Sequence, residues 1–315
     1  MLSRISRCSL LLACLLIIAV ASANAATCPT STSTLTTYGS GSSTTTIAVA
    51  ANFSQPMASF LTTYFTVAYP AYTVIMCADS TGNFEATIDA ALANGQPSPY
   101  SMLFAADNSP VTKYASHSPY MYAKGIPVLF GYLPGSGQSL TITGLSSLVA
   151  NQTSNYITAN TAGLHSRTVS THLTSGTAEV AMANPAKAPY GVEAQNILNA
   201  MLPIDGSSFS IPTNVPAWIK TPLTTYSNIT LTFNAVGTSE PAGFVAKSQI
   251  CGHLKDGTIA WVQFSSTDFQ LQQTAVNFGT NAGGNQLSTY IKSWMTHPPA
   301  TRWNTFLTTW CYVTI

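Results

Sequence analysis

The stretch Ile47-Ala48-Val49-Ala50-Ala51-Asn52-Phe53-Ser54-Gln55-Pro56 decides how this chain is organised. A short apolar run stops at Asn52, and apolar residues at helical spacing begin directly after it. The pattern predicts a strand that enters a helix through a tight turn. Asn52 or Ser54 can cap that helix, and Pro56 fits its first turn, where a missing N–H costs nothing. Such a turn favours anions, because free N–H groups and the helix dipole point at one spot.

The N-terminus has the composition of a secretory signal peptide. Arg4 and Arg7 precede an apolar run over residues 10–20, and small residues follow up to Ala25. We therefore expect residues 1–25 to be removed and the mature protein to be periplasmic or extracellular. A transmembrane anchor is disfavoured, because the apolar run is short for a membrane span.

The mature chain carries very little charge. The full sequence has eleven Lys and Arg and ten Asp and Glu, and removal of Arg4 and Arg7 leaves nine basic residues. Nothing in the sequence forms a basic patch that could bind a nucleic-acid backbone, so we expect no nucleic-acid partner. The abundant Ser, Thr, Asn, Gln and Tyr predict a neutral polar surface, which would stay hydrated in an acidic external medium.

Four cysteines remain after the signal peptide: Cys28, Cys77, Cys251 and Cys311. An even number in an oxidising compartment predicts two disulfides, with three possible pairings. The sequence contains neither a CxxC pair nor a His/Cys cluster, so no structural zinc site is expected.

Strand and helix patterns alternate along the mature chain, whose length suits two domains or one large one. A Ser/Thr/Gly tract over residues 26–46 predicts a flexible leader. Strands are expected at 47–51, 72–76 and 101–105 with helical patterns between them, an order that implies parallel pairing and an α/β fold. Further strands are expected at 126–130, 180–183, 230–236, 242–246 and 275–278, and further helices at about 191–202 and 285–295.

Catalytic motifs are missing from the sequence. It contains no GxSxG, no HExxH, no P-loop and no GxGxxG after a strand. Asp79, Glu85, Asp89 and Asp107 could be assembled into a carboxylate pair, but helix caps and solvated faces explain them better. We therefore expect no enzymatic activity and no cofactor.

Three polar turns each end a strand and open a helix: Ala51-Asn52, Ser80-Thr81-Gly82 and Pro189-Tyr190-Gly191. Together they offer hydroxyls, an amide and free N–H groups without a fixed positive charge, which suits a dehydrated tetrahedral oxyanion. Taken singly, each has a plain structural explanation as a helix cap, an ordinary turn or a packed aromatic ring. Their agreement on one type of ligand favours a shared site.

In its order of motifs the sequence resembles the periplasmic molybdate-binding proteins of ABC transporters, over most of residues 47–300. The matching pieces are Ala50-Ala51-Asn52-Phe53, Ser80-Thr81-Gly82, Leu103-Phe104-Ala105-Ala106-Asp107, Tyr122-Ala123-Lys124-Gly125, Ala183-Asn184-Pro185 with Ala188-Pro189-Tyr190-Gly191, Asn234-Ala235-Val236-Gly237, Gly243-Phe244-Val245-Ala246 and Ser293-Trp294-Met295. The resemblance is weak over 134–178 and 250–270.

This resemblance implies a type II periplasmic-binding fold, with two α/β domains, two crossover strands and an oxyanion in the cleft. Domain I would comprise residues 47–121 and 276–315, and domain II residues 122–275. The chain would cross between the domains near Ala123–Phe130 and near Gln272–Asn277.

The resemblance also implies a set of ligand-binding residues: Ala51, Asn52, Ser80, Thr81, Tyr190 and Val236. Molybdate or tungstate would be held by Asn52, Ser80 and Tyr190. Thr81 is a second candidate beside Ser80, and Ala51 and Val236 would contribute backbone N–H groups.

Two departures from the family pattern affect this site. The family usually has Ser or Thr where Ala51 stands, so one hydroxyl is lost, which would cost roughly 1.5–3 kcal/mol if nothing replaces it. The segment between Val236 and Gly243 is too short for the helix that the family usually has there.

We therefore expect a monomeric solute-binding protein that captures a molybdate- or tungstate-like oxyanion and delivers it to an inner-membrane ABC permease. The alternative is a fold relative that acts as an extracellular sensor or adhesion module without a transport role, and the two departures favour it. For the disulfides we expect Cys28–Cys77 and Cys251–Cys311, because the leader precedes the strand beside Cys77.

Overall fold

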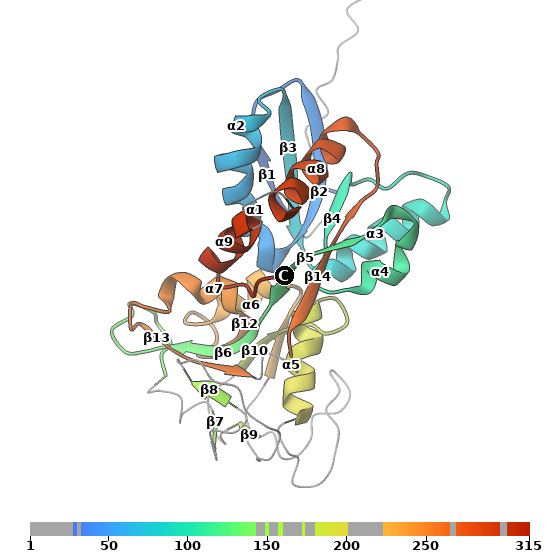
Figure 1. The fold of residues 1–315 in the computed structure, drawn as a ribbon. Helices are drawn as coiled ribbons and strands as arrows, with labels where there is room; N and C mark the ends of the chain where they lie inside the picture. The colour runs from blue at the N-terminus through green and yellow to red at the C-terminus, as the bar shows by residue number, and fades with distance from the viewer. Residues whose placement is uncertain are drawn as a thin grey trace, which may run out of the picture.

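The computed structural model describes residues 28–29, 33–142, 149–150, 157–159, 172–173, 180–200, 223–264, 269–296 and 301–315. Within this part of the chain there are two α/β domains, each built around a six-stranded sheet (Figure 1). The expected signal peptide, residues 1–25, lies outside the described residues.

The sheet of domain I has the strand order β1-β3-β2-β4-β14-β5. Its strands are β1 (Thr34–Tyr38), β2 (Ser43–Ala50), β3 (Tyr72–Asp79), β4 (Met102–Phe104), β5 (Tyr120–Gly125) and β14 (Leu271–Asn277). The three central strands β3, β2 and β4 are parallel, as the alternation of strand and helix patterns predicts. β1 and β14 are antiparallel to their neighbours.

Helices cover both faces of this sheet. One face carries a continuous helical segment made of η1 (Ala51–Phe53), α1 (Ser54–Phe60), η2 (Leu61–Phe65) and α2 (Thr66–Ala68), together with α8 (Ala282–Thr296) and α9 (Thr301–Thr309). The other face carries α3 (Thr81–Ala93), α4 (Ser109–Lys113) and the turn η3 (Ala115–His117). Because side chains alternate along a strand, Ile47 of β2 packs in the first core with Phe53, and Ala48 packs in the second with Phe84.

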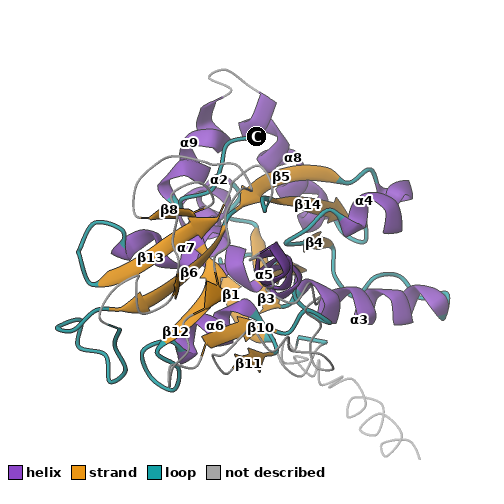
Figure 2. Ribbon diagram, turned by 90° about the horizontal axis from the view of Figure 1, so that it is seen from below, coloured by secondary structure: helices purple, strands orange, loops and turns teal. Residues whose placement is uncertain are grey.

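The sheet of domain II has the order β11-β10-β12-β6-β13-β8. Its strands are β6 (Pro127–Tyr132), β8 (Ile157–Ala159), β10 (Val180–Ala183), β11 (Leu223–Tyr226), β12 (Ala242–Ala246) and β13 (Ile259–Phe264), while β7 (Val149–Ala150) and β9 (His172–Leu173) pair separately. The helices around this sheet are α5 (Pro189–Ala200), α6 (Ile229–Ala235), α7 (Lys247–Ile250) and the turn η5 (Cys251–His253) (Figure 2).

Two crossings join the domains. β5 belongs to the first sheet and β6 to the second, so the first crossing lies at Ile126, inside the range predicted from the sequence. The chain returns to the first sheet after β13, which ends at Phe264, and before β14, which begins at Leu271, so the return crossing precedes the predicted range 272–277. The whole of β14 consequently belongs to domain I.

The prediction of a flexible leader over residues 26–46 is wrong for its second half. Thr34–Tyr38 forms β1 in antiparallel register with β3, and β2 already begins at Ser43. The Thr-rich sequence suits an exposed edge strand, because β-branched residues fit a pleated, half-buried surface.

Both expected disulfides are confirmed. Cys28–Cys77 ties the segment before β1 to β3, inside domain I. Cys251–Cys311 joins η5 of domain II to the segment after α9 of domain I. The second disulfide is therefore a covalent link between the domains, in addition to the two crossings.

The predicted strand at 230–236 is wrong, because this segment forms the helix α6. Its β-branched and aromatic composition favours a strand locally, but the side chain of Asn228 caps a helix by accepting a hydrogen bond from Leu231 N at 3.0 Å. Ile229, Thr232 and Ala235 then lie on one buried helical face. The segment after Val236 is too short for a helix, and the helix α6 lies before Val236 instead. β11 is the strand that precedes α6.

Candidate functional site

The candidate site lies where strand ends from both domains meet. In domain I, β2 leads into η1 and β3 leads into α3. In domain II, β10 leads to the start of α5 and β11 to the start of α6. Hydrogen bonds across the domain boundary bring these helix starts together, as the sequence predicts for Asn52, Ser80 and Tyr190.

At the start of α3, backbone and side-chain groups of the two domains are directly bonded. Gly82 N donates to Lys187 O at 2.9 Å. A Cβ at position 82 would lie 2.7 Å from this carbonyl oxygen, so the close approach requires glycine. Beside it, Asn228 Nδ2 donates to Asp79 Oδ1 at 3.2 Å. Asp79 is fully buried.

At the start of η1, backbone carbonyls accept from hydroxyls of domain II. Thr230 Oγ1 donates to Ala51 O at 3.2 Å, and Ser248 Oγ donates to Asn52 O at 3.3 Å. Ala51 itself contributes a methyl group, and it lies in a buried interdomain cluster of apolar side chains, most of them alanines. The cluster comprises Ala50, Ala51, Ala106, Ala183, Ala188, Tyr190, Ile229, Ala246 and Leu271.

A second set of polar groups lies beside the crossings, and we call it the hinge network: Asn52, Tyr122, Tyr190, Gln273 and Tyr312. Asn52 Nδ2 donates to Gln273 Oε1 at 3.2 Å and to the hydroxyl of Tyr312 at 2.9 Å. Gln273 Nε2 donates to the hydroxyl of Tyr190 at 3.1 Å, and the hydroxyl of Tyr122 donates to Gln273 Oε1 at 3.0 Å. The side-chain amide of Asn52, which the sequence assigns to an anion, is therefore bonded within the protein.

The hinge network contains no charged side chain. Burial raises the pKa of the Tyr122 and Tyr190 hydroxyls well above its usual value, and it also raises the pKa of Tyr312. The three hydroxyls therefore stay protonated and act as neutral donors and acceptors.

Of the two candidates on the second turn, Thr81 is committed to the fold. Its hydroxyl accepts from Ala106 N at 2.9 Å and so holds the turn after β4. Ser80 caps α3 through a longer contact, 3.4 Å between Asn83 N and Ser80 Oγ. Both hydroxyls accept in these contacts, so each keeps its O–H group for donation.

Val236 is not brought to the domain boundary. It ends α6 instead of preceding a helix, and it packs inside domain II with Val128, Ala181 and Ile250. Asn228 occupies the helix start that the resemblance assigns to Val236. A sequence signal for Asn228 exists, since an N-cap residue stands directly before apolar positions at helical spacing.

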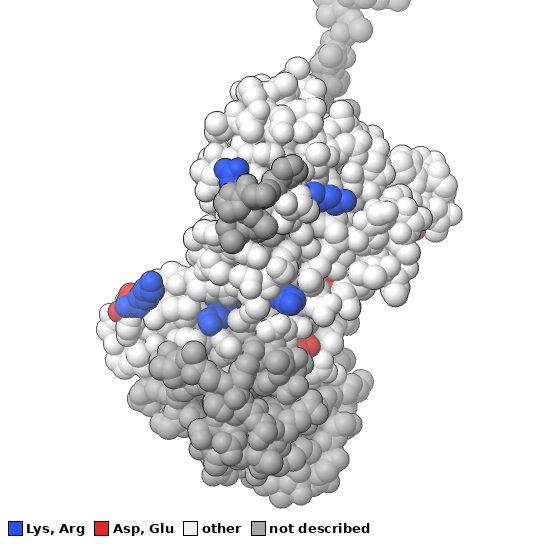
Figure 3. All heavy atoms as spheres, in the orientation of Figure 1, with Lys and Arg blue, Asp and Glu red and all other residues white. Residues whose placement is uncertain are grey.

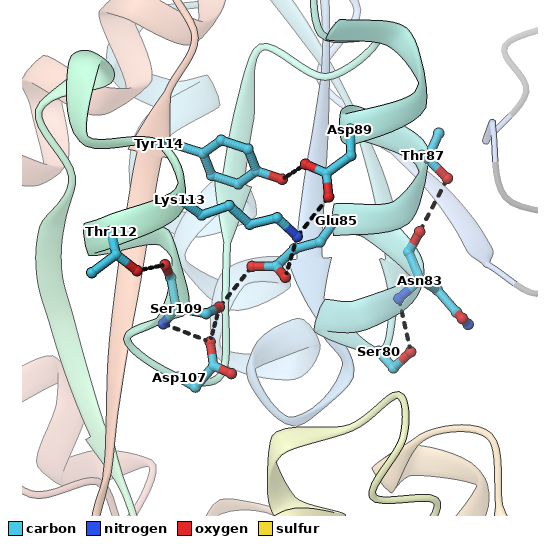
Figure 4. A network of polar contacts seen from close by, with 10 residues as sticks. All are labelled: Ser80, Asn83, Glu85, Thr87, Asp89, Asp107, Ser109, Thr112, Lys113 and Tyr114. Atoms are coloured by element: carbon cyan, nitrogen blue, oxygen red, sulfur yellow. Dashed lines mark hydrogen bonds and ion pairs between the residues drawn. The ribbon is translucent and has the colours of Figure 1, made fainter. Parts of the chain in front are cut away.

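Three other carboxylates of domain I, those of Glu85, Asp89 and Asp107, have structural roles (Figure 4). Lys113 Nζ lies 2.9 Å from Glu85 Oε2 and 2.6 Å from Asp89 Oδ2, which ties α4 to α3. Asp107 Oδ1 accepts from the backbone and hydroxyl of Ser109 at the start of α4. Burial and the nearby Glu85 raise the pKa of Asp107, while its contacts with Ser109 oppose this shift.

A groove of about 300 Å³ opens at the β1 edge of the domain boundary, and we call it the β1 groove. It lies between β1 and α1 on one side and α6 on the other. It is lined without charged residues by Thr34, Thr36, Tyr38, Ala51, Ser54, Gln55, Ala58, Met76, Ala78, Asn228, Thr230, Leu231 and Asn234. In the strand order β1 lies farthest from the crossover strand β5.

Charged side chains are scattered over the described surface in Figure 3. Among the described residues, no group of three or more His, Cys, Asp or Glu side chains could hold a metal ion. Within the same part of the chain, every helix is too short or too polar to cross a membrane.

Comparison with known proteins agrees with this architecture. A model of the bacterial extracellular solute-binding protein family matches residues 45–291. The periplasmic molybdate-binding protein of Azotobacter vinelandii superposes with a TM-score of 0.56 at 20% identity, covering 86% of this chain and 99% of that one. A substrate-binding domain assigned to a molybdenum ABC transporter of Clostridium difficile gives 0.48 at 11% identity, covering 87% and 100%. None of the curated proteins matches by sequence. The fold is thus that of type II periplasmic-binding proteins.

Proposed function

The chain belongs to the family of bacterial extracellular solute-binding proteins, and we propose that it captures a small tetrahedral oxyanion between its two domains for an ABC importer. Molybdate and tungstate are the anions that the resemblance suggests, and sulfate and phosphate share their shape. The loaded protein would dock on an inner-membrane permease as a monomer.

The observation that carries this proposal is the meeting of helix starts from both domains around buried neutral polar groups. Ser80 and Asn52 come from domain I, and Asn228 and Tyr190 come from domain II. Neutral N–H and O–H dipoles at helix starts are a suitable environment for an oxyanion stripped of water. In the closed arrangement described here, acceptor groups of the protein itself take the hydrogen bonds of some of these donors. Ligand entry therefore requires the domains to separate and the donors to exchange partners.

Titration calorimetry with molybdate, tungstate, sulfate and phosphate tests the proposal. We expect heat of binding with at least one of them, and a roughly tenfold to hundredfold weaker affinity in Ser80→Ala, because a lost hydrogen bond to a charged group costs about 1.5–3 kcal/mol. Thr87→Ala is the matched control, since Thr87 lies on α3 beyond its first turn and bonds only Asn83 O in Figure 4. Equal affinities of the two variants would contradict the assignment of Ser80.

A second candidate is a fold relative that does not transport an anion and acts as an extracellular sensor or adhesion module. The bond from Gly82 N to Lys187 O favours it, because a backbone donor of the α3 start is already taken by the facing domain. The methyl group of Ala51 at the η1 start points the same way. A folded protein that gives no heat with any of the four anions would support this candidate and exclude the first.

A further inference from the structure

The buried carboxylate of Asp79 bears on which oxyanion this site can accept. Asp79 is the last residue of β3, directly before the start of α3, and its exposed fraction is 0%. Oδ1 accepts from Ser80 N at 2.7 Å and from Asn228 Nδ2 at 3.2 Å, and Oδ2 accepts from Asn83 Nδ2 at 3.0 Å. Two of these donors belong to helix starts of opposite domains, which are the donors that a bound anion would use.

An anion bound between Ser80 and Asn228 would therefore lie against a carboxylate oxygen. Two negative charges in contact repel strongly in an interior of low dielectric constant. The repulsion is relieved when the ligand directs an O–H group at the carboxylate, because the contact then becomes a charge-assisted hydrogen bond. A ligand that is only an acceptor cannot make this bond.

Asn52 gives a second, independent indication. It is 3% exposed, and its Nδ2 atom is used by Gln273 and Tyr312. Its Oδ1 atom is buried without a hydrogen-bond partner among the described residues. A buried carbonyl oxygen left in this state is costly, and an O–H group brought by a ligand would satisfy it. The residue expected to donate to an anion thus offers an acceptor instead.

We propose that Asp79 restricts this site to oxyanions that still carry a proton. Hydrogen phosphate and hydrogen arsenate retain an O–H group near neutral pH, whereas sulfate, molybdate and tungstate are fully deprotonated and present only acceptor oxygens. Asp79 acts here as a specificity-determining residue. The inference rests on the proposed capture of an oxyanion and narrows its ligand class.

Calorimetry at pH 7 with sodium phosphate, arsenate, sulfate, molybdate and tungstate tests this on the mature protein. We expect phosphate and arsenate to bind at least tenfold more tightly than the other three. Glycerol 3-phosphate distinguishes free phosphate from an ester, and we expect the ester to bind at least tenfold more weakly because the site is enclosed between the domains. Asp79→Asn replaces an acceptor oxygen by a donor at nearly constant shape. It should therefore lower the ratio of phosphate affinity to sulfate or molybdate affinity by at least tenfold.

Two further variants keep the result interpretable. Asp79→Ser removes the carboxylate differently, in case Asp79→Asn unfolds, and circular dichroism monitors folding. Asp256→Asn removes an exposed carboxylate of domain II and should leave the preference unchanged. Tight binding of sulfate or molybdate by the unaltered protein, or an unchanged preference in the folded Asp79 variants, overturns the role of Asp79 and leaves oxyanion capture intact. If neither the protein nor the variants bind any of the anions, oxyanion capture itself fails, and this inference fails with it.

Discussion

The two edges of the domain boundary are built differently. At the hinge edge, the buried hinge network and the Cys251–Cys311 disulfide join the domains beside the crossings. At the β1 edge, the domains meet across a neutral groove, and the contacts are single hydrogen bonds such as those from Asn228 and Thr230. A covalent link and a shared buried network cannot separate without large cost, whereas single hydrogen bonds can exchange with a ligand or water. We therefore expect the domains to open first at the β1 edge, while the hinge edge stays in place.

Removal of the interdomain disulfide should have the largest effect on the difference between the hinge edge and the β1 edge. We expect Cys251→Ala/Cys311→Ala to lower the free energy of unfolding by about 2–4 kcal/mol and to increase the radius of gyration of the ligand-free protein. The sequence separation of the paired cysteines is 60 for this disulfide and 49 for Cys28–Cys77, so the loss in stability should be similar for both. Guanidinium unfolding and small-angle scattering provide the two measurements.

Cys28→Ala/Cys77→Ala is the matched control, because this disulfide lies within domain I. It should lower the stability without changing the radius of gyration. If the two pairs of variants expand equally, the Cys251–Cys311 disulfide does not restrain opening.

Close packing at the hinge gives the next largest effect. A Cβ at Gly125, the last residue of β5, would clash with the hydroxyl of Tyr190 and with Gln273 Nε2. Gly125→Ala should therefore cost about 1–3 kcal/mol in the free energy of unfolding and displace Tyr190 from the hinge network. Denaturant unfolding measures the cost, and Gly252→Ala, where a Cβ meets nothing within 4 Å, is the control. If Gly125→Ala left the free energy of unfolding unchanged, the hinge network would be able to move as easily as the β1 edge.

Sequence reasoning could predict the parts of this molecule that local patterns determine. The central strands of domain I and the helix starts after them follow from apolar runs that precede the polar turns at Asn52 and Ser80. The expected disulfides follow from the leader, which precedes the strand beside Cys77. The resemblance places the first crossing correctly, but it places the return crossing too late in the chain.

The failures share one physical cause, since tertiary contacts overrule local preference. Thr230–Val236 has the composition of a strand, but the Asn228 cap and the buried face of α6 make it a helix. Val236, to which the resemblance assigns a backbone N–H donor, therefore ends α6 and packs inside domain II. Asp79 and Gln273 could not be recognised as neighbours of the site either, because their partners Asn228 and Tyr190 lie far away in sequence.

The smallest of the predicted effects isolates the β1 edge. Asn228→Asp keeps a good cap for α6 but replaces the donor to Asp79 by a second carboxylate. We expect it to favour opening by about 1.5 kcal/mol, because a hydrogen bond to a charged group is lost and separation relieves the repulsion. Hydrogen exchange should then quicken at the amide of Gly82, which is bonded across the boundary, and stay unchanged at the amide of Val313, which donates to a carbonyl of β5. Asn234→Asp, the same change at an exposed position of α6, should alter neither amide. Faster exchange at both amides in Asn228→Asp would show that the edges open together.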